Sequence, residues 1–84
     1  MSLTPDQCRA ARGLLNLSRP DLAGLSGMSL RTIAYFEDGK RQPVGPTLDA
    51  LRQALEKAGV VFIDENGGGP GVRLPKAKRK ASKK

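Results

Sequence analysis

With 84 residues, the chain has room for one small domain with a marginal hydrophobic core, which makes assembly into an oligomer a reasonable expectation. It contains one cysteine and no histidine, which excludes an internal disulfide, a cysteine-cluster metal site and the commonest acid–base and nucleophilic catalysts. The formal net charge is +7, but residues 76–84 contribute six of these charges, so that the first 75 residues are nearly neutral. Where the cations of the domain lie therefore matters more than its overall charge.

The sequence also lacks the other usual signs of catalysis and targeting. No pair of carboxylates lies on a predicted apolar pocket wall, and we expect neither enzymatic activity nor a cofactor or bound metal. The N-terminus has no basic region followed by an apolar one, and the longest strongly apolar run covers only residues 60–63. We therefore expect a cytoplasmic protein that does not associate with a membrane.

The N-terminal region predicts a helix that follows Thr4. Thr4 is in the N-cap position, and Gln7, three residues later, completes a capping box. Leu3 and Cys8 have the spacing of a hydrophobic staple, which favours a packing role for the cysteine over a redox role. Asn16 tolerates the left-handed backbone conformation and is expected to end this helix.

Two short helices joined by a tight turn are predicted next. Ser18 can cap the first of them, with Asp21 as its capping-box partner, and Gly27 ends it. Ser29 can cap the second helix, which ends at Gly39 because glycine readily adopts a left-handed conformation. The pattern of the segment is helix, turn, helix.

The second helix of this pair has an inward and an outward side. On a helical wheel, Arg31 and Tyr35 lie one turn apart on the outward side. A guanidinium and a phenol at this spacing suit a helix that docks in the major groove of DNA, and they equally suit an ordinary solvated face. Glu37 lies on the inward side, as does Arg12 of the preceding helix. Because a buried charge without a partner is costly, these two residues are predicted to form an ion pair.

Two adjacent cations, Lys40 and Arg41, follow the second helix in a loop that ends at Pro43. A loop of this kind can be no more than a solvated turn. Next to a helix that reads DNA, it is better interpreted as a clamp for a phosphate group.

Helical periodicity returns over residues 47–58, with Thr47 as the predicted cap and Gly59 as the stop. Its apolar face closes the core and consists of Leu48, Leu51, Leu55 and Ala58. Arg52 and Glu56 are predicted to form an i, i+4 ion pair away from that face.

The next segment predicts a β-strand, since Val60, Val61, Phe62 and Ile63 are β-branched or aromatic without alternation. Such a strand is expected to be covered on both faces. A glycine-rich loop that lacks the Lys-Ser/Thr pair of a phosphate-binding P-loop separates it from a return strand at residues 72–74. One face of this hairpin can cover the helices, and the other is predicted to pair with a second copy of the chain, the alternative being a strand folded back on its own helices.

The domain organisation follows from these elements. Residues 1–59 are predicted to form a DNA-binding domain, and residues 60–75 a strand or hairpin that serves as the dimerisation element. Residues 76–84 contain no core-forming side chains and are predicted to be a basic disordered tail.

The spaced residues of this chain resemble the Cro and phage-repressor (XRE-type) helix-turn-helix family over roughly residues 3–58. The matching positions are Arg12, Leu17, Ser18, Leu22, Ala23, Gly27, Ser29, Thr32, Ile33, Glu37, Gly39 and Pro43. The resemblance implies a mainly α fold, a lambda-repressor-like helical bundle, to which a short C-terminal strand or hairpin is added here. The chain departs from the family at Arg19, where glutamine is usual, and at Pro20.

The resemblance also implies site residues. The second helix of the pair is the recognition helix in this family, and four residues fall where the family reads bases: Leu30, Arg31, Ala34 and Tyr35. Five fall where it touches phosphates: Arg19, Ser29, Thr32, Lys40 and Arg41. The family also has the equivalent of the Arg12–Glu37 bridge.

These observations lead to a functional hypothesis. The chain is expected to bind double-stranded DNA sequence-specifically, as a transcriptional regulator, most simply a repressor, that acts as a homodimer on a palindromic operator. RNA recognition is disfavoured because the chain has too few aromatic residues for a stacking platform. The alternative hypothesis is the antitoxin of a toxin–antitoxin pair, whose C-terminal segment would bind a toxin-like protein partner.

Overall fold

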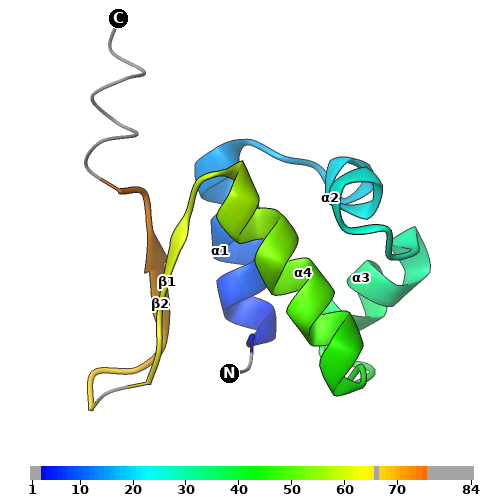
Figure 1. Cartoon of the computed structure of the whole chain (residues 1–84). Coiled ribbons are helices and arrows are strands. Elements are labelled where there is room, and N and C mark those ends of the chain that lie inside the picture. Colours follow the sequence, from blue (N-terminus) through cyan, green and yellow to red (C-terminus); the bar gives the residue numbers. More distant parts are fainter. Residues whose placement is uncertain (1–2, 66, 76–84) are drawn as a thin grey trace, which may run out of the picture.

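The computed structural model of the protein describes residues 3–65 and 67–75 (Figure 1). In this part of the chain the fold is mainly helical with one small antiparallel hairpin. The elements in chain order are α1 (Pro5–Leu15), α2 (Arg19–Ser26), α3 (Leu30–Glu37), α4 (Gly45–Ala58), β1 (Val61–Ile63) and β2 (Gly71–Arg73). No helix among the described residues is long and apolar enough to cross a membrane. The predicted tail at residues 76–84 lies outside the described residues.

The ends of α1, α2 and α3 confirm the predicted caps. Thr4 and Ser18 both close capping boxes with the residue three positions later, and the Ser29 hydroxyl accepts a hydrogen bond from the third residue of α3. Asn16 and Gly27 have φ values of 59° and 76°, which is the left-handed conformation that ends a helix. These caps satisfy backbone groups that would otherwise be unpaired at the helix ends.

Helix α4 begins two residues earlier than the sequence predicted. Its N-cap is Val44, which has no side-chain capping bond. Thr47, the predicted cap, lies instead in the first turn, where its backbone N–H donates to the Val44 carbonyl oxygen at 3.0 Å. The fixed φ of Pro46 suits the first turn of a helix, and this starts the helix without a polar cap.

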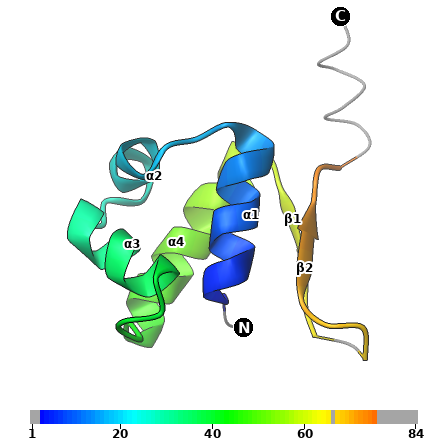
Figure 2. The same ribbon diagram turned by 180° about the vertical axis from the view of Figure 1, so that it is seen from behind.

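The core lies among the four helices, with the hairpin on one side of α1 and α4 and with α2 and α3 on the other (Figures 1 and 2). Its largest fully buried apolar side chains come from α2, α3 and α4, and they are Leu22, Ile33, Phe36, Leu51 and Leu55. On a helical wheel Ile33, Phe36 and Glu37 lie on the inward side with Ser29; the first three are buried, whereas Ser29 is exposed. The outward residues Arg31 and Tyr35 are exposed.

The hairpin pairs β1 with β2, and one side chain of α1 donates hydrogen bonds to both strands. Phe62 lies opposite Val72 in the register, and Ile63 lies opposite Gly71. The amide nitrogen of Gln7 donates to the carbonyl oxygens of Ile63 at 3.3 Å and Gly71 at 3.0 Å. The same side chain accepts from the Thr4 N–H, so one buried glutamine both caps α1 and binds the two strands.

The prediction that β1 is covered on both faces is wrong for the single chain. Val60 and Phe62 are buried in the core, whereas Val61 is 40% exposed. A two-stranded sheet packs only one face on the helices, so its burial alternates along the strand even though its hydrophobicity does not.

Candidate nucleic-acid interface

A groove of about 350 Å³ separates α3 from the N-terminal end of α4. It brings together two residues predicted to read bases and two predicted to touch phosphates. Four further residues, from the following loop and α4, were not predicted to belong to the site. The lining residues are Arg31, Thr32, Tyr35, Arg41, Gln42, Pro43, Val44 and Thr47. The four additional residues could not be found from helical periodicity, since they depend on the path of the loop.

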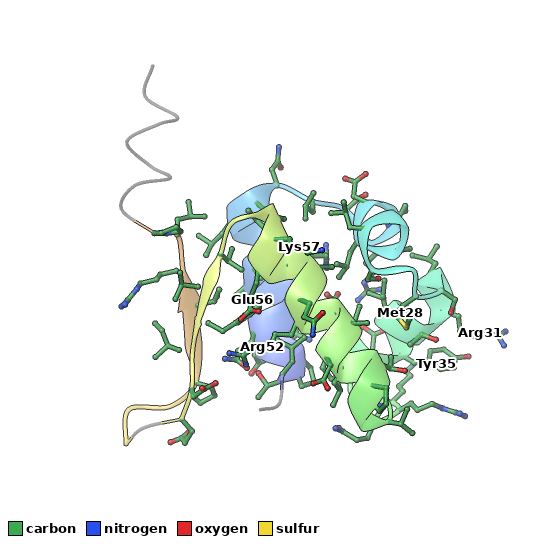
Figure 3. All side chains as sticks on the ribbon, in the orientation of Figure 1. Met28, Arg31, Tyr35, Arg52, Glu56 and Lys57 are labelled. Carbon is green, nitrogen blue, oxygen red and sulfur yellow. The ribbon has the colours of Figure 1, made fainter. Side chains whose placement is uncertain are left out.

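Arg31 and Tyr35 project together from the outward side of α3, at the end of the molecule remote from the hairpin (Figure 3). The Arg31 guanidinium carbon lies 5.8 Å from the centroid of the Tyr35 ring, a cation–π distance. The ring therefore restrains the arginine without consuming its N–H donors. Leu30 is exposed and Ala34 is half-buried on the same helix, and neither lines the groove.

The hydroxyl groups of Ser29 and Thr32 have different tasks. The Ser29 oxygen accepts from the Thr32 backbone N–H at 3.0 Å and its hydroxyl donates to the Thr32 hydroxyl oxygen at 2.9 Å. Ser29 is thus fully engaged as the cap of α3, whereas the Thr32 proton can still be donated to a ligand. Ser29 and Thr32 were both predicted to contact phosphates, and Thr32 is the better placed donor of the two.

The described cations divide into paired and unpaired sets. Arg9, Arg12, Arg19 and Arg52 all contact carboxylates. The cations without an ion pair among residues 3–65 and 67–75 are Arg31, Lys40, Arg41, Lys57 and Arg73. Three of these five lie on α3 or in the loop that follows it. The positive charge available to a ligand is therefore concentrated beside the groove, although the domain as a whole is nearly neutral.

A buried carboxylate, Glu37, is the last residue of α3. Glu37 has no exposed side-chain area and receives two hydrogen bonds from Arg12, at 2.8 Å to Oε2 and 2.7 Å to Oε1. Arg9 of α1 also donates to the Glu37 backbone carbonyl. The predicted Arg12–Glu37 ion pair is present, and it joins α1 to the end of α3.

The electrostatics of this cluster favour its charged form. Burial alone would raise the pKa of Glu37, but hydrogen bonds from Arg12, Cys8 and Arg19 outweigh burial and lower it. The hydrogen bond to Glu37 raises the pKa of Arg12 in turn. Burial and the neighbouring carboxylate raise the pKa of the Cys8 thiol, which remains neutral in the core.

Arg19 has partners that the sequence did not predict. Its Nε donates to Glu37 Oε1 at 2.9 Å, and its Nη2 donates to Asp38 Oδ1 at 3.0 Å. These hydrogen bonds raise the pKa of Arg19. The residue predicted to touch phosphate is thus held by two carboxylates in the free protein, and the helix that it begins is tied to the end of α3.

The hairpin end of the molecule contains a second cluster, of which the sequence predicted one ion pair. Arg52 was predicted to lie away from the apolar face of α4, and the structure shows that it is buried. It forms the predicted ion pair with Glu56 at 3.2 Å, a further one with Asp64 at 3.3 Å, and a cation–π contact of 4.9 Å with Phe62. Figure 3 shows Arg52 and Glu56 between α4 and the hairpin.

The four predicted dimerisation residues do not share one surface. Val60 and Phe62 belong to the core, whereas Val61 and Ile63 alternate with them and keep exposed area. Ile63 packs beside Gly71 on this outer face, within 3.6 Å of where a Cβ at that glycine would lie.

Within the part of the chain that the structure describes, no group of three or more histidine, cysteine or acidic residues is arranged to hold a metal ion. No protein-family model matches the chain, and no curated protein does. The geometry and charge of the groove beside α3 are thus the main basis for a functional argument.

Proposed function

We propose that the protein is a sequence-specific double-stranded DNA-binding transcriptional regulator of the helix-turn-helix kind. In this proposal α2 and α3 form the helix-turn-helix, α3 enters the major groove, and the protein acts in the cytoplasm as a homodimer on a two-fold operator.

The observation that carries the proposal is the distribution of unpaired cations. Arg31 and Arg41 line one groove and Lys40 directly precedes Arg41 in the chain, while the arginines elsewhere in the helical core are neutralised by carboxylates. A surface that concentrates positive charge on a helix and the adjoining loop complements a phosphate backbone.

Each side chain then has a role that suits its chemistry. Arg31 can donate two hydrogen bonds to guanine, the commonest specific contact in a major groove, and the exposed Leu30 can contact a thymine methyl group. Thr32, Lys40 and Arg41 bind phosphates and fix the register of the helix on the duplex. Gln42 joins this set because it lines the same groove.

Dimerisation is proposed to use the outer face of the hairpin. Val61 and Ile63 are the apolar residues available there, since Val60 and Phe62 serve the core. A two-fold arrangement would fix the separation of the two α3 helices, and for a dimeric reader this separation must match that of successive major grooves, about 34 Å.

Selection from a pool of random duplexes tests the proposal. The wild-type protein is expected to enrich a palindromic motif. Arg31→Ala is expected to relax the motif at one or two positions, with a loss of discrimination of about 1 to 3 kcal/mol per base pair. Lys57→Ala is the matched control because it also removes one exposed cation, at the other end of α4 (Figure 3). Failure of the wild-type protein to enrich any motif would overturn the proposal.

A further inference from the structure

Arg19 binds two carboxylates, one of which is buried and the other exposed. Glu37, which binds its Nε, has no exposed side-chain area, whereas Asp38, which binds its Nη2, is 45% exposed. The Arg19 side chain is itself 30% exposed, and its Nη1 donates no hydrogen bond to any described residue. The inner half of the guanidinium is therefore anchored, and the outer half faces solvent beside a carboxylate that solvent can also reach.

The buried charge of Glu37 does not need Asp38 for its compensation. Arg12 already binds both oxygens of Glu37, so the buried charge is compensated without Asp38. Asp38 is the C-cap of α3, where a negative charge is unfavourable because it meets the negative end of the helix dipole. The Asp38 carboxylate thus has one evident partner in the described structure, the outer edge of Arg19.

The Arg19–Asp38 pair lies near the start of the loop that carries the unpaired cations Lys40 and Arg41. Asp38 lies two residues before Lys40, and the Lys40 N–H donates to the Tyr35 carbonyl oxygen at 2.8 Å, which holds the start of the loop against the end of α3. The Arg19 guanidinium is therefore close in space to the chain that carries Lys40 and Arg41. A phosphate bound along this edge of the molecule would meet Asp38 as well.

We infer that Asp38 masks a phosphate site: its carboxylate occupies the outer edge of the Arg19 guanidinium in the free protein and is exchanged for a phosphodiester oxygen when DNA docks. This inference rests on the proposed function. The exchange replaces one charge-assisted hydrogen bond with another, and it leaves the Asp38 carboxylate next to the duplex. Asp38 therefore weakens binding to every duplex by a similar factor and carries no information about base sequence.

The test compares Asp38→Asn with the wild-type protein on the selected duplex and on a random duplex. The amide keeps the size of the side chain and an oxygen acceptor for Arg19 but removes the charge. We expect binding to both duplexes to tighten by about two- to fivefold, the range of an exposed ion pair. The slope of log K against log [salt] should become steeper by up to about 0.9. Asp49→Asn, which makes the same change in net charge at an exposed position of α4, is expected to leave both quantities unchanged.

The dependence on Arg19 separates unmasking from simple charge removal. In an Arg19→Ala background, Asp38→Asn should have a clearly smaller effect, because only the repulsion between the carboxylate and the duplex is then removed, and Arg19→Gln provides a second background if the alanine variant does not fold. Equal gains with and without Arg19, or equal gains from Asp38→Asn and Asp49→Asn, would overturn the inference while leaving the proposed function intact. If the wild-type protein binds no duplex, the proposed function fails and the inference fails with it.

Discussion

The two charged clusters of this protein have opposite arrangements. Between α1, α2 and α3, the buried centre is an acid, Glu37, and the arginines that surround it are partly exposed. Between α4 and the hairpin, the buried centre is a base, Arg52, and its carboxylate partners Glu56 and Asp64 are 42% and 50% exposed. The residue at each centre is the one whose removal leaves other groups without compensation, so its substitution should cost more than substitution of a partner.

The largest expected effect is at the centre of the first cluster. Glu37→Gln leaves two arginines beside a neutral amide in the core and should lower the free energy of unfolding by about 3 kcal/mol. In a domain of this size such a loss lowers the melting temperature by about 10 °C or more. Thermal denaturation followed by circular dichroism measures this shift. Glu56→Gln, the same chemical change at an exposed partner, should cost only a few tenths of a kcal/mol. Equal melting temperatures for the two variants would contradict the distinction between centre and partner.

The Glu37 carboxylate should also make the free energy of unfolding depend on pH. The pKa of Glu37 in the folded protein is lowered from its ordinary value of 4.5, so the unfolded chain takes up the proton first as the pH falls. The stabilisation is therefore fully present above about pH 4.5 and is lost as the pH falls through the lower folded value. Urea denaturation should show a difference between wild type and Glu37→Gln that is constant from pH 6 to 7 and narrows below pH 4.5. A difference that stays constant in acid would mean that Glu37 does not titrate in this way.

The comparison of the clusters also shows how far the sequence predicts the structure. The caps at Thr4, Ser18 and Ser29 and the helix ends at Asn16 and Gly27 follow rules that involve neighbours within one turn, and the structure has all of them. The Arg12–Glu37 pair could be predicted as well, because both residues lie on inward helix sides and opposite charges there require each other.

Features that depend on contacts between distant segments could not be predicted. Gln7 binds carbonyl groups 56 and 64 residues away. Arg52 is buried by a hairpin whose position on α4 no local pattern specifies, and Val61 is exposed because the helices cover only one face of the sheet. For the candidate site, the outward residues of α3 were identified from periodicity, whereas Gln42 and Val44 entered the groove through the path of a loop.

Substitution at the centre of the second cluster should have a smaller and more local effect. Arg52→Met keeps an unbranched apolar stem but loses two ion pairs with exposed carboxylates and the cation–π contact with Phe62. We expect a loss of about 1 to 2 kcal/mol, because each of these contacts is worth roughly 1 kcal/mol or less. Hydrogen exchange should accelerate for amides of β1 and β2 and remain unchanged in α2 and α3.

Glu56→Gln again provides the control, since it removes one of the partners and keeps Arg52 in place. Its hairpin amides should exchange nearly as slowly as those of the wild-type protein. Faster exchange throughout the helices of Arg52→Met, rather than in the hairpin, would show that Arg52 stabilises the whole domain and does not anchor the hairpin locally.

The smallest effect on stability is expected on the outer face of the hairpin, where the proposed dimer forms. Truncation of the chain after Gly59 is a poor test, since it would remove Val60 and Phe62 from the core. Val61→Glu is better: residue 61 is exposed and lies opposite Arg73, so a glutamate there can form a cross-strand ion pair within its own hairpin. The stability of the monomer should change by no more than about 0.5 kcal/mol.

In the proposed dimer, by contrast, Val61→Glu would bury a carboxylate from each copy where an apolar side chain now lies. Sedimentation equilibrium should therefore show a dimer for the wild-type protein and a monomer for Val61→Glu. Leu14→Glu, at a similarly exposed apolar position on α1, should remain dimeric. A Val61→Glu protein that sediments as the wild type does would remove the hairpin from the proposed interface, because Val61 and Ile63 are the residues of β1 that the core of the single chain leaves partly exposed.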